Sequence, residues 1–525
     1  MKYIIPIIAT FFFFSCNEGS PKQVEKVTTR DTTITTANAF SQLFFDSLKL
    51  EQFLEKEASG DSMANYMRSF YNSRNFSFAW FHEDGLTVQA QGFWSAHDML
   101  VKQLTDSSLY DGQLHQMIDT LLSDSSFIIN KKQLEETELR FTKHFFSYLQ
   151  FAYAGKVDPQ EVQWHIPRRK LKPVALLDSF LNSEKSDWKP LNKPYYSLQQ
   201  QLFRYNDIEK NGGWGAITTT TTLKPGSKNN LIIAVKKRLQ STGLYSAVDT
   251  SDFYDNELLI AVKKAETSFG LKADGVVDKD LIKQLNIPVA ERIRQMLINL
   301  ERMKWMPELS SNYLFANIPE YRLHVMENGK KVLAMNIVVG KAANSTVIFS
   351  DELKYVVFSP YWNVPRSIVR NEIYPAMRRS SSYLRRNNME VTGYSNGLPI
   401  VRQKPGNSNA LGHVKFIFPN SYNIYFHDTP SRDLFNRQQR AFSHGCIRLQ
   451  QPFDLAVYLL RNQPEWTDEK IKAAMNNSKE KWVTLGKTVP VFITYFTSWV
   501  DEEGLLHFTD DIYGHDKKLA AHLFE

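Results

Sequence analysis

The segment AFSHGCIRLQ, residues 441–450, holds Cys446, one of only two cysteines among the 525 residues of this chain. His444 lies two positions before Cys446, and side chains two positions apart in an extended segment point to the same face. His427 lies near the end of another expected strand, NIYFHDTP. Because a free thiol has a pKa of about 8.5, a neighbouring imidazole that takes its proton would create a nucleophile.

The neighbours of these residues supply the other parts of an acyl-transfer centre. A backbone carbonyl or carboxylate at Asp428 could hold the imidazole in one tautomer. Gly445 lets the main chain approach a substrate closely, where a backbone N–H could stabilise an oxyanion. From residue types alone, Cys446 could equally be a buried inert thiol. His427, His444 and Cys446 could also bind zinc, although no CxxC or HxxxH pair supports a metal site.

The other cysteine, Cys16, follows a short apolar run at the start of the chain. Lys2 precedes this run, whose length of about a dozen residues is less than the roughly 20 that cross a bilayer as a helix, so it predicts a cleaved export signal. The ending FFSC resembles a bacterial lipoprotein signal, in which the cysteine is acylated and becomes the mature N-terminus. We therefore expect a body lipid-anchored to a membrane and facing the periplasm; an uncleaved anchor or ordinary secretion is the alternative. Cys446 is then a lone thiol in an oxidising compartment.

Length and composition predict several globular domains. The length suits about three domains of roughly 150 residues each, and a hydrophobic content of 42% is enough for their cores. The net charge of +7 is small for this length and indicates no particular partner; no nucleic-acid partner is expected. Residues 17–39 are rich in Thr, Lys, Glu and Asn with few large apolar side chains, which suits a disordered tether.

Two helical regions follow the tether. Apolar residues recur at helical spacing from Phe40 to Tyr205, as in FTKHFFSYLQFAYAG. Residues 211–230 form a break rich in Gly, Thr, Pro and Asn. Residues 231–285 then predict three helices, LIIAVKKRLQSTG, NELLIAVKKAETSFG and KDLIKQLN, with the turn LKADGVVD before the last.

This helical module resembles the peptidoglycan-binding domain found on many wall enzymes. The resemblance rests on the sequence FGLKADG, and it implies that Phe269, Asp274 and Gly275 contact the glycan. In that family a glycine and a threonine commonly follow the Asp-Gly turn, whereas Asp278 and Asp280 stand here. A three-helix spacer that binds nothing is therefore the alternative.

From Asn312 onward the pattern changes to strands. The sequence YRLHVMENGKKVLAMNIVVG alternates apolar and polar residues on both sides of Asn328-Gly329, the dipeptide best suited to a type I′ hairpin turn. LKYVVFSPYWNVP and VKFIFPNSYNIYFHDTP add further strands. QPFDLAVYLLRN, residues 451–462, predicts an amphipathic helix with Pro452 in its first turn. The C-terminal region is therefore β-rich.

The spacing around Cys446 is similar to that of a known catalytic domain. His427, fifteen intervening residues and SHGCIR closely resemble the signature of the L,D-transpeptidases. The resemblance implies that Cys446 is the nucleophile, that His427 is its base, and that Asp428 orients the ring through its backbone carbonyl. SPYWNVPRSIVRNEIYPAMR and LFNRQQRAFSHGCIRL extend the likeness to the large multi-domain periplasmic branch, which carries a helical scaffold and a peptidoglycan-binding module.

Further residues are expected around the donor peptide. Arg448 stands where many relatives carry asparagine; it could bind a donor carboxylate through two hydrogen bonds, or pair with an acidic neighbour. Trp362 and Tyr425 could form aromatic walls, although a tryptophan is more often simply packed. The predicted substrate-binding residues are Ser443, His444, Arg448, Trp362, Asn363 and Tyr425.

A basic segment interrupts the expected strands between Trp362 and Leu411. Its arginines could attract the carboxylates of peptide stems, or form a solvated helix face. In the large branch the corresponding insertion, residues 367–410 here, caps the active site. The arginines are Arg366, Arg370, Arg378, Arg379, Arg385, Arg386 and Arg402.

The expected fold is a multi-domain α+β chain, in which a helical scaffold and a small helical wall-binding module precede a β-rich L,D-transpeptidase catalytic domain with a helical cap. The predicted domains are a signal peptide at 1–16, a tether at 17–39, a scaffold at 40–222, a peptidoglycan-binding-like domain at 223–290, a linker helix at 291–311, a catalytic domain at 312–515 with its cap at 367–410, and a tail at 516–525.

The expected function is that of a monomeric, lipid-anchored L,D-transpeptidase without metal or cofactor. Its partners would be the peptide stems and glycan of peptidoglycan, and it would form 3-to-3 cross-links through a cysteinyl thioester. An L,D-carboxypeptidase or wall-attachment hydrolase on the same site is one alternative. A non-catalytic wall-binding lipoprotein is the other.

Overall fold

The computed structural model describes residues 26–524 except 58, 105–108, 124–129, 184–190, 219–220 and 248. The predicted signal peptide, with Cys16, and residues 17–25 of the predicted tether lie outside the described residues. The chain divides into two compact units, Met1–Leu149 with Lys172–Trp188, and Gln150–Leu171 with Lys189–Glu525. Among the described helices, none combines the length and the apolar character needed to cross a membrane.

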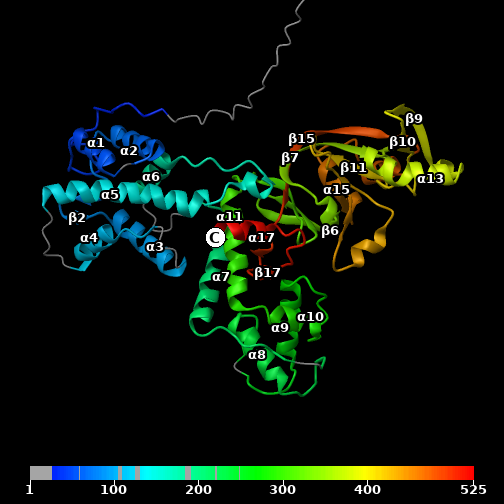
Figure 1. The fold of residues 1–525 in the computed structure, drawn as a ribbon, viewed down its shortest axis with the longest axis horizontal. Helices are drawn as coiled ribbons and strands as arrows, with labels where there is room; N and C mark the ends of the chain where they lie inside the picture. Colours follow the sequence, from blue (N-terminus) through cyan, green and yellow to red (C-terminus); the bar gives the residue numbers. More distant parts are fainter. Residues whose placement is uncertain are drawn as a thin grey trace, which may run out of the picture. The chain divides into compact units, whose positions relative to one another are not determined.

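The first unit is helical, as its periodicity predicts (Figure 1). Trp80 is fully buried between Phe141 and Phe145, with ring centroids 4.7 and 5.5 Å away. The described half of the predicted tether is bonded to this unit: Thr28 donates its N–H to Ser69 Oγ at 3.1 Å. The elements are α1 Ser47–Lys56, α2 Asp61–Ser73, β1 Phe81–His82, β2 Gly85–Leu86, α3 Val88–Leu104, α4 Gly112–Ser123, α5 Lys131–Leu149 and α6 Pro173–Leu181.

The helices of the second unit include the predicted module. Helices α7 and α11 run side by side (Figure 1), and α8, α9 and α10 enclose a core in which Val235, Leu258 and Leu281 are fully buried. The three predicted module helices are therefore confirmed. The helical elements up to α11 are η2 Gln150–Ala154, η3 Pro159–Val162, α7 Lys193–Lys210, α8 Leu231–Ser241, α9 Asn256–Ser268, α10 Lys279–Leu285 and α11 Val289–Trp305.

A ten-stranded sheet follows, in the order β11-β12-β14-β6-β5-β4-β15-β7-β3, with β13 beside β6. Strand β11 also pairs with β7, so the sheet closes on itself. The strands are β3 Trp164–His165, β4 Asn312–Asn317, β5 Arg322–Glu327, β6 Lys330–Gly340, β7 Ile348–Phe358, β11 Val414–Ile417, β12 Phe426–His427, β13 Ala441–Ser443, β14 Ile447–Leu449 and β15 Lys481–Thr494.

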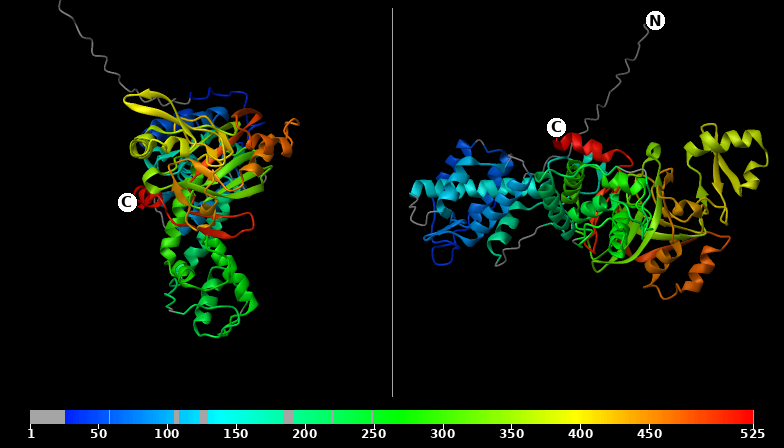
Figure 2. Two further views of the ribbon diagram at one scale, coloured as in Figure 1. Left: turned by 90° about the vertical axis from the view of Figure 1, so that its right-hand side faces the viewer. Right: turned by 90° about the horizontal axis from the view of Figure 1, so that it is seen from below.

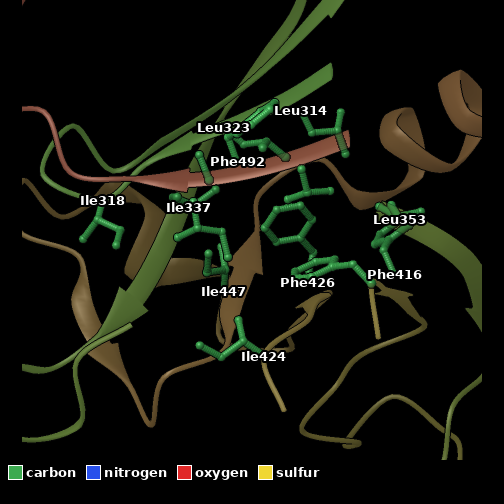
Figure 3. Packing of buried hydrophobic residues seen from close by; sticks show 14 of the residues in the cluster. Leu314, Ile318, Leu323, Ile337, Leu353, Phe416, Ile424, Phe426, Ile447 and Phe492 are labelled. Carbon is green, nitrogen blue, oxygen red and sulfur yellow. The ribbon is translucent and has the colours of Figure 1, made fainter. Parts of the chain in front are cut away.

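The predicted hairpin turn is confirmed between β5 and β6. Glu327 pairs with Lys330, and Asn328 and Gly329 have φ of 51° and 72°, as a two-residue type I′ turn requires. The sheet encloses an apolar core in which Leu323, Ile337 and Phe426 are fully buried (Figure 3). Alternation along each strand therefore sends every second side chain inward and leaves the intervening ones for the other face.

The insertion forms a lobe with its own core of Val364, Ile368, Val369, Ile373 and Val401 (Figure 2, right, yellow). The expected helical cap is incomplete, because a three-stranded sheet in the order β8-β10-β9 accompanies its helices. An Asn396-Gly397 turn, with φ of 45° and 75°, joins two of its strands. The elements are β8 Trp362–Asn363, α12 Arg366–Ile368, η5 Val369–Ile373, α13 Tyr374–Arg379, α14 Tyr383–Arg386, β9 Met389–Ser395 and β10 Leu398–Gln403.

The last elements pack on the same sheet. Helix α15 begins at the predicted Pro452, which confirms that helix. Of the segment expected to be a tail, residues 516–525, the described residues belong to helix α17 instead, because its apolar face buries Leu519 and Ala520 in the main core. The elements are η4 Ala342–Asn344, η6 Arg432–Asn436, α15 Pro452–Leu460, α16 Asp468–Met475, β16 Ser498–Val500, β17 Leu506–Phe508 and α17 His515–Phe524.

Candidate active site

Two short parallel strands place the chemical groups. In β12 and β14, Phe426 pairs with Ile447 in register, and His427 pairs with Arg448. Phe426 and Ile447 are fully buried in the apolar core. Because side chains alternate along a strand, His427 and Arg448 point to the opposite face. The apolar residues of these strands therefore fix the register that brings the polar ones together.

The polar side chains line a cleft of about 640 Å³. His444 and Cys446 share this cleft, as the two-residue spacing predicts. Gly445 and Asp428 do not line it. The lining residues that the sequence singled out are Trp362, Asn363, Tyr425, His427, Ser443, His444, Cys446 and Arg448.

The imidazole of His427 is held in one tautomer. Its Nδ1 lies 2.5 Å from the backbone oxygen of Asp428, which can only accept, so Nδ1 carries the proton and Nε2 can take one. The Asp428 carboxylate accepts a hydrogen bond from the N–H of His413 at 2.9 Å instead. Burial, and then the charge of Arg448, lower the pKa of His427 to about 3. The resting imidazole is therefore neutral.

The thiol of Cys446 is partly exposed in the cleft rather than enclosed in the core. It lies 3.6 Å from the backbone oxygen of Asn423. Burial raises the pKa of the thiol, while hydrogen bonds with Tyr425 and the positive charge of Arg448 lower it. The cleft therefore holds a neutral thiol and a neutral imidazole. Among the described residues, no group of three or more His, Cys, Asp and Glu side chains is placed to hold a metal ion.

The backbone around Gly445 is held by side-chain hydroxyls. Gly445 has φ of 120°, a conformation open mainly to glycine, and its N–H donates to Ser443 Oγ at 3.1 Å. Thr346 Oγ1 donates to the Gly445 oxygen at 2.8 Å. In a trans peptide the carbonyl and the next N–H point in opposite directions, so this bond directs the N–H of Cys446 away from Thr346.

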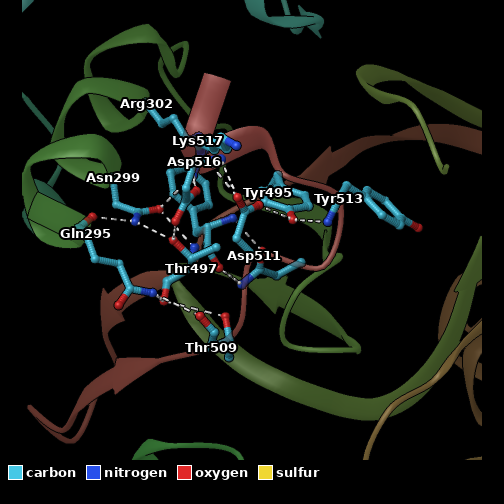
Figure 4. A network of polar contacts seen from close by, with 12 residues as sticks. Gln295, Asn299, Arg302, Tyr495, Thr497, Thr509, Asp511, Tyr513, Asp516 and Lys517 are labelled. Atoms are coloured by element: carbon cyan, nitrogen blue, oxygen red, sulfur yellow. Dashed lines mark hydrogen bonds and ion pairs between the residues drawn. The ribbon is translucent and has the colours of Figure 1, made fainter. Parts of the chain in front are cut away.

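A polar relay connects Thr346 to helix α17, and Figure 4 shows its part from Tyr513 through Tyr495 and Asp511 to Asp516 and Lys517. The Tyr513 hydroxyl donates to the oxygen of Gly340, whose N–H donates to Thr346 Oγ1 at 2.9 Å. The Tyr513 N–H donates to the hydroxyl of Tyr495 at 2.8 Å, and that hydroxyl donates to Asp511 at 2.7 Å. The same carboxylate accepts the N–H groups of Asp516 and Lys517 at the start of α17.

Arg448 has no acidic partner among the described residues. Its Nε is buried without a hydrogen-bond partner, and no described carboxylate lies within 4 Å of its guanidinium. Burial lowers the pKa of Arg448, and the neighbouring Cys446 thiol raises it. Of the two alternatives, the acidic neighbour is therefore not found in the described structure, and the guanidinium lines the cleft.

Sequence reasoning missed two charged groups in the cleft. Glu372, from η5 of the insertion, lies 3.6 Å from His444 Nε2 and is the only described carboxylate in the lining. Lys415 pairs with His427 in the register of β11 and β12, and burial lowers its pKa. The alternation of VKFIF could have placed Lys415 on the polar face. None of the seven arginines of the insertion lines the cleft; Arg402, for example, is paired with Glu390 at 2.5 Å.

The module residues Phe269, Asp274 and Gly275 do not form one site. The N–H of Gly275 donates to Glu266 at 2.8 Å, and Gly275 has φ of 76°, so Asp274-Gly275 serves as a tight turn. Phe269 instead packs toward Phe508, with ring centroids 6.4 Å apart.

A family model described as "L,D-transpeptidase catalytic domain" matches residues 311–491. The chain carries an L,D-transpeptidase catalytic domain. Two further models match, a "Scaffold domain" at residues 65–202 and a "Putative peptidoglycan binding domain" at residues 228–285. The multi-domain L,D-transpeptidase organisation and the α+β fold class are thereby confirmed, and these are domains of the cell envelope.

Individual relatives are more distant. A "Putative L,D-transpeptidase" of Haemophilus influenzae is 31% identical over 242 residues, which cover 43% of this chain and 49% of that protein. The chain thus spans about half the length of this curated L,D-transpeptidase relative. An L,D-transpeptidase from Stackebrandtia nassauensis, known from a crystal structure, is 14% identical in sequence. The match covers 53% of this chain and 97% of that chain, with a TM-score of 0.22. An L,D-transpeptidase from Xylanimonas cellulosilytica is 13% identical in sequence. The match covers 53% of this chain and 99% of that chain, with a TM-score of 0.18.

Proposed function

We propose that this L,D-transpeptidase domain forms 3-to-3 cross-links between the peptide stems of peptidoglycan through a cysteinyl thioester. The observation that supports this most is the shared cleft of His427 and Cys446, in which the imidazole is neutral and its Nε2 is the nitrogen able to accept a proton. In this proposal the catalytic residues are the predicted Cys446, His427, Asp428 and Gly445.

In the acylation step, Cys446 gives its proton to His427 Nε2, and its sulfur attacks the carbonyl carbon of the third stem residue, diaminopimelate. The N–H of Cys446 and the hydroxyl of Tyr425 stabilise the oxyanion. Burial and the contact with Cys446 raise the pKa of Tyr425, so this hydroxyl stays protonated. His427 returns the proton to the amine of D-alanine as the C–N bond breaks, and a thioester remains.

In the transfer step, the side-chain amine of a second stem attacks the thioester carbon. The amine loses a proton through His427, the thiolate leaves and is reprotonated, and an amide forms. The peptide bond cleaved first supplies the energy, so no cofactor is required. Arg448, unpaired in the described structure, binds a carboxylate of the donor stem.

Purified disaccharide tetrapeptide tests this proposal. We expect mass spectrometry to find a dimer with loss of D-alanine, and no dimer with Cys446→Ala. Tripeptide without dimer would replace the transferase with an L,D-carboxypeptidase, and intact substrate would leave a non-catalytic wall-binding protein.

We also propose that the protein is a monomer anchored by a lipid on Cys16 and facing the periplasm. The support is the FFSC ending of the apolar N-terminal run. Labelling cells with an alkyne fatty acid should mark the wild-type protein and not Cys16→Ser; equal labelling would refute the anchor.

A further inference from the structure

A second cleft of about 590 Å³ lies within the larger unit, between the helical module and the closed sheet. Its walls are the ends of α9 and α10, the turn between β4 and β5, the loop before β13, and the β16–β17 hairpin. This volume is in the range of small-molecule sites, about 300–1,000 Å³. We call it the junction cleft.

A packed contact fixes the two sides of the junction cleft. The guanidinium of Arg292 on α11 lies 5.1 Å from the Phe269 ring of the module and 4.3 Å from the Phe508 ring of β17. Arg292 is only 4% exposed. The two rings lie 6.4 Å apart and the buried guanidinium contacts both of them, so this packed cluster holds the two walls together. The junction cleft is therefore a formed site.

The lining of the junction cleft is polar but balanced in charge. Four lysine or arginine side chains face four carboxylates. The two histidines are each paired with a carboxylate: His324 with Glu320 at 3.0 Å, and His507 with Asp501 at 2.8 Å. A balanced set of this kind gives no net attraction to an ionic peptide stem, so it suits a ligand without net charge.

The junction cleft also offers a flat surface and exposed amides. The rings of Trp499 and His507 are stacked, with centroids 4.9 Å apart and planes 4° from parallel, and both are partly exposed. Gln438 and Gln439 line the cleft and are exposed. Flat rings that accept C–H faces, together with amides that bond hydroxyl and acetamido groups, are the groups that bind sugars.

The junction cleft is linked closely to the thiol. Gln439 precedes β13 and lies only seven positions before Cys446. Seven residues span at most about 25 Å, so a polymer bound here stays within that reach of the thiol.

We infer that the junction cleft binds the neutral glycan strand of peptidoglycan, a polymer of N-acetylated amino sugars. The inference rests on the proposed function in taking the wall as substrate. It assigns glycan binding to the module and the catalytic domain jointly, whereas the module residues alone form a turn and a packing contact.

Titration of oligomers of N-acetylglucosamine, which are N-acetylated amino sugars without charged groups, into the full chain tests the inference. We expect binding that changes less than twofold between 50 and 500 mM NaCl. Gln438→Ala/Gln439→Ala and Trp499→Ala should each weaken it at least tenfold. The matched controls Gln113→Ala/Gln116→Ala and Trp482→Ala, which lie outside the junction cleft, should bind as the wild type does.

Three results would overturn the inference: no binding by the wild type, equal binding by all variants, or binding only of free tetrapeptide with strong dependence on salt. Thermal unfolding checks each variant, and if Trp499→Ala is unfolded, the exposed glutamine pair decides. Carbapenem adducts on Cys446, measured in the same samples, separate the two proposals. A wild-type protein that forms no adduct would count against Cys446 as the nucleophile. Junction-cleft variants that form the adduct and still bind glycan as the wild type does would count against the junction cleft alone.

Discussion

In the active-site cleft the guanidinium of Arg448 has no carboxylate within 4 Å among the described residues, whereas in the junction cleft His324 and His507 are each paired with one. The first cleft holds two lysine or arginine side chains against the single carboxylate of Glu372. The second holds equal numbers of both signs. The same closed sheet contributes to both clefts.

This difference in charge pairing suits the first cleft to a reaction and the second to ligand recognition. An unpaired, half-buried cation is unfavourable for folding, but it lowers the pKa of His427 and partly offsets the burial that raises the pKa of the thiol. Groups that are already paired change little when a neutral ligand arrives, so they can select shape without driving a reaction. Substitutions in the two clefts should therefore fail in different assays.

The largest effect should come from the base. His427→Gln should slow carbapenem acylation of Cys446 by about 10²–10⁴-fold, the usual contribution of a general base. His444→Gln should slow it less than about tenfold, because His444 is exposed and lies 3.6 Å from Glu372. Intact-mass spectrometry against time measures both rates, with Cys446→Ala as the blank. Comparable rates for the two variants would place the base elsewhere.

A smaller loss should follow from the Thr346 hydroxyl. Loss of a whole oxyanion donor costs about 10²–10³-fold, so Thr346→Val, which only releases the peptide that carries the donor, should lower kcat by about tenfold with KM unchanged. Thr346→Ser keeps the hydroxyl and should restore the rate. A Ser variant as slow as the Val variant would mean that packing, not the hydrogen bond to Gly445, is responsible.

The pH dependence should be weak on the acid side. The pKa of His427 is about 3, so acylation should change less than about twofold between pH 7 and 5.5, where a base with a pKa of about 6.5 would lose about eightfold. Arg448→Gln should raise the pKa of His427, and the fall in acylation rate on the acid side of the pH profile should then begin at a higher pH. A fall in the wild-type acylation rate centred near pH 6.5 would contradict the lowered pKa of His427.

The lowered pKa of His427 should also make the stability of the protein depend on pH. Below about pH 6.5 the unfolded imidazole binds a proton and the folded one does not, so the free energy of unfolding should fall as the pH falls toward 3. His427→Gln should lose part of this dependence, which denaturant unfolding at pH 7 and pH 5 would measure.

The smallest effect of a substitution concerns Glu372. It is 57% exposed, and exposed pairs contribute about 0.2–1 kcal/mol, so Glu372→Gln should slow transfer to the cationic acceptor stem only about two- to fivefold. Acylation should be unchanged, and Glu465→Gln on an exposed loop is the control. An equal loss in acylation would show that Glu372 supports the site as a whole.

Local patterns predicted much of this structure. Asn328-Gly329 identified one hairpin, and the spacing of His444 and Cys446 placed them in one cleft, because turns and strand alternation depend on near neighbours. The sequence also contains Asn396-Gly397, a signal of the same type, which predicts the hairpin of β9 and β10 that a purely helical cap leaves out. Glu372 and Thr346 could not be found this way, because their roles depend on contacts between segments far apart in the chain.

The polar relay has a consequence for when the enzyme becomes active. The peptide before Cys446 is held by Thr346, which is linked through Tyr513 and Asp511 to the first turn of α17. These residues are synthesised about seventy positions after the thiol. A chain still being synthesised therefore displays its cysteine well before the peptide that Thr346 holds is fixed in place, and the proposed active site should be complete only once α17 has docked.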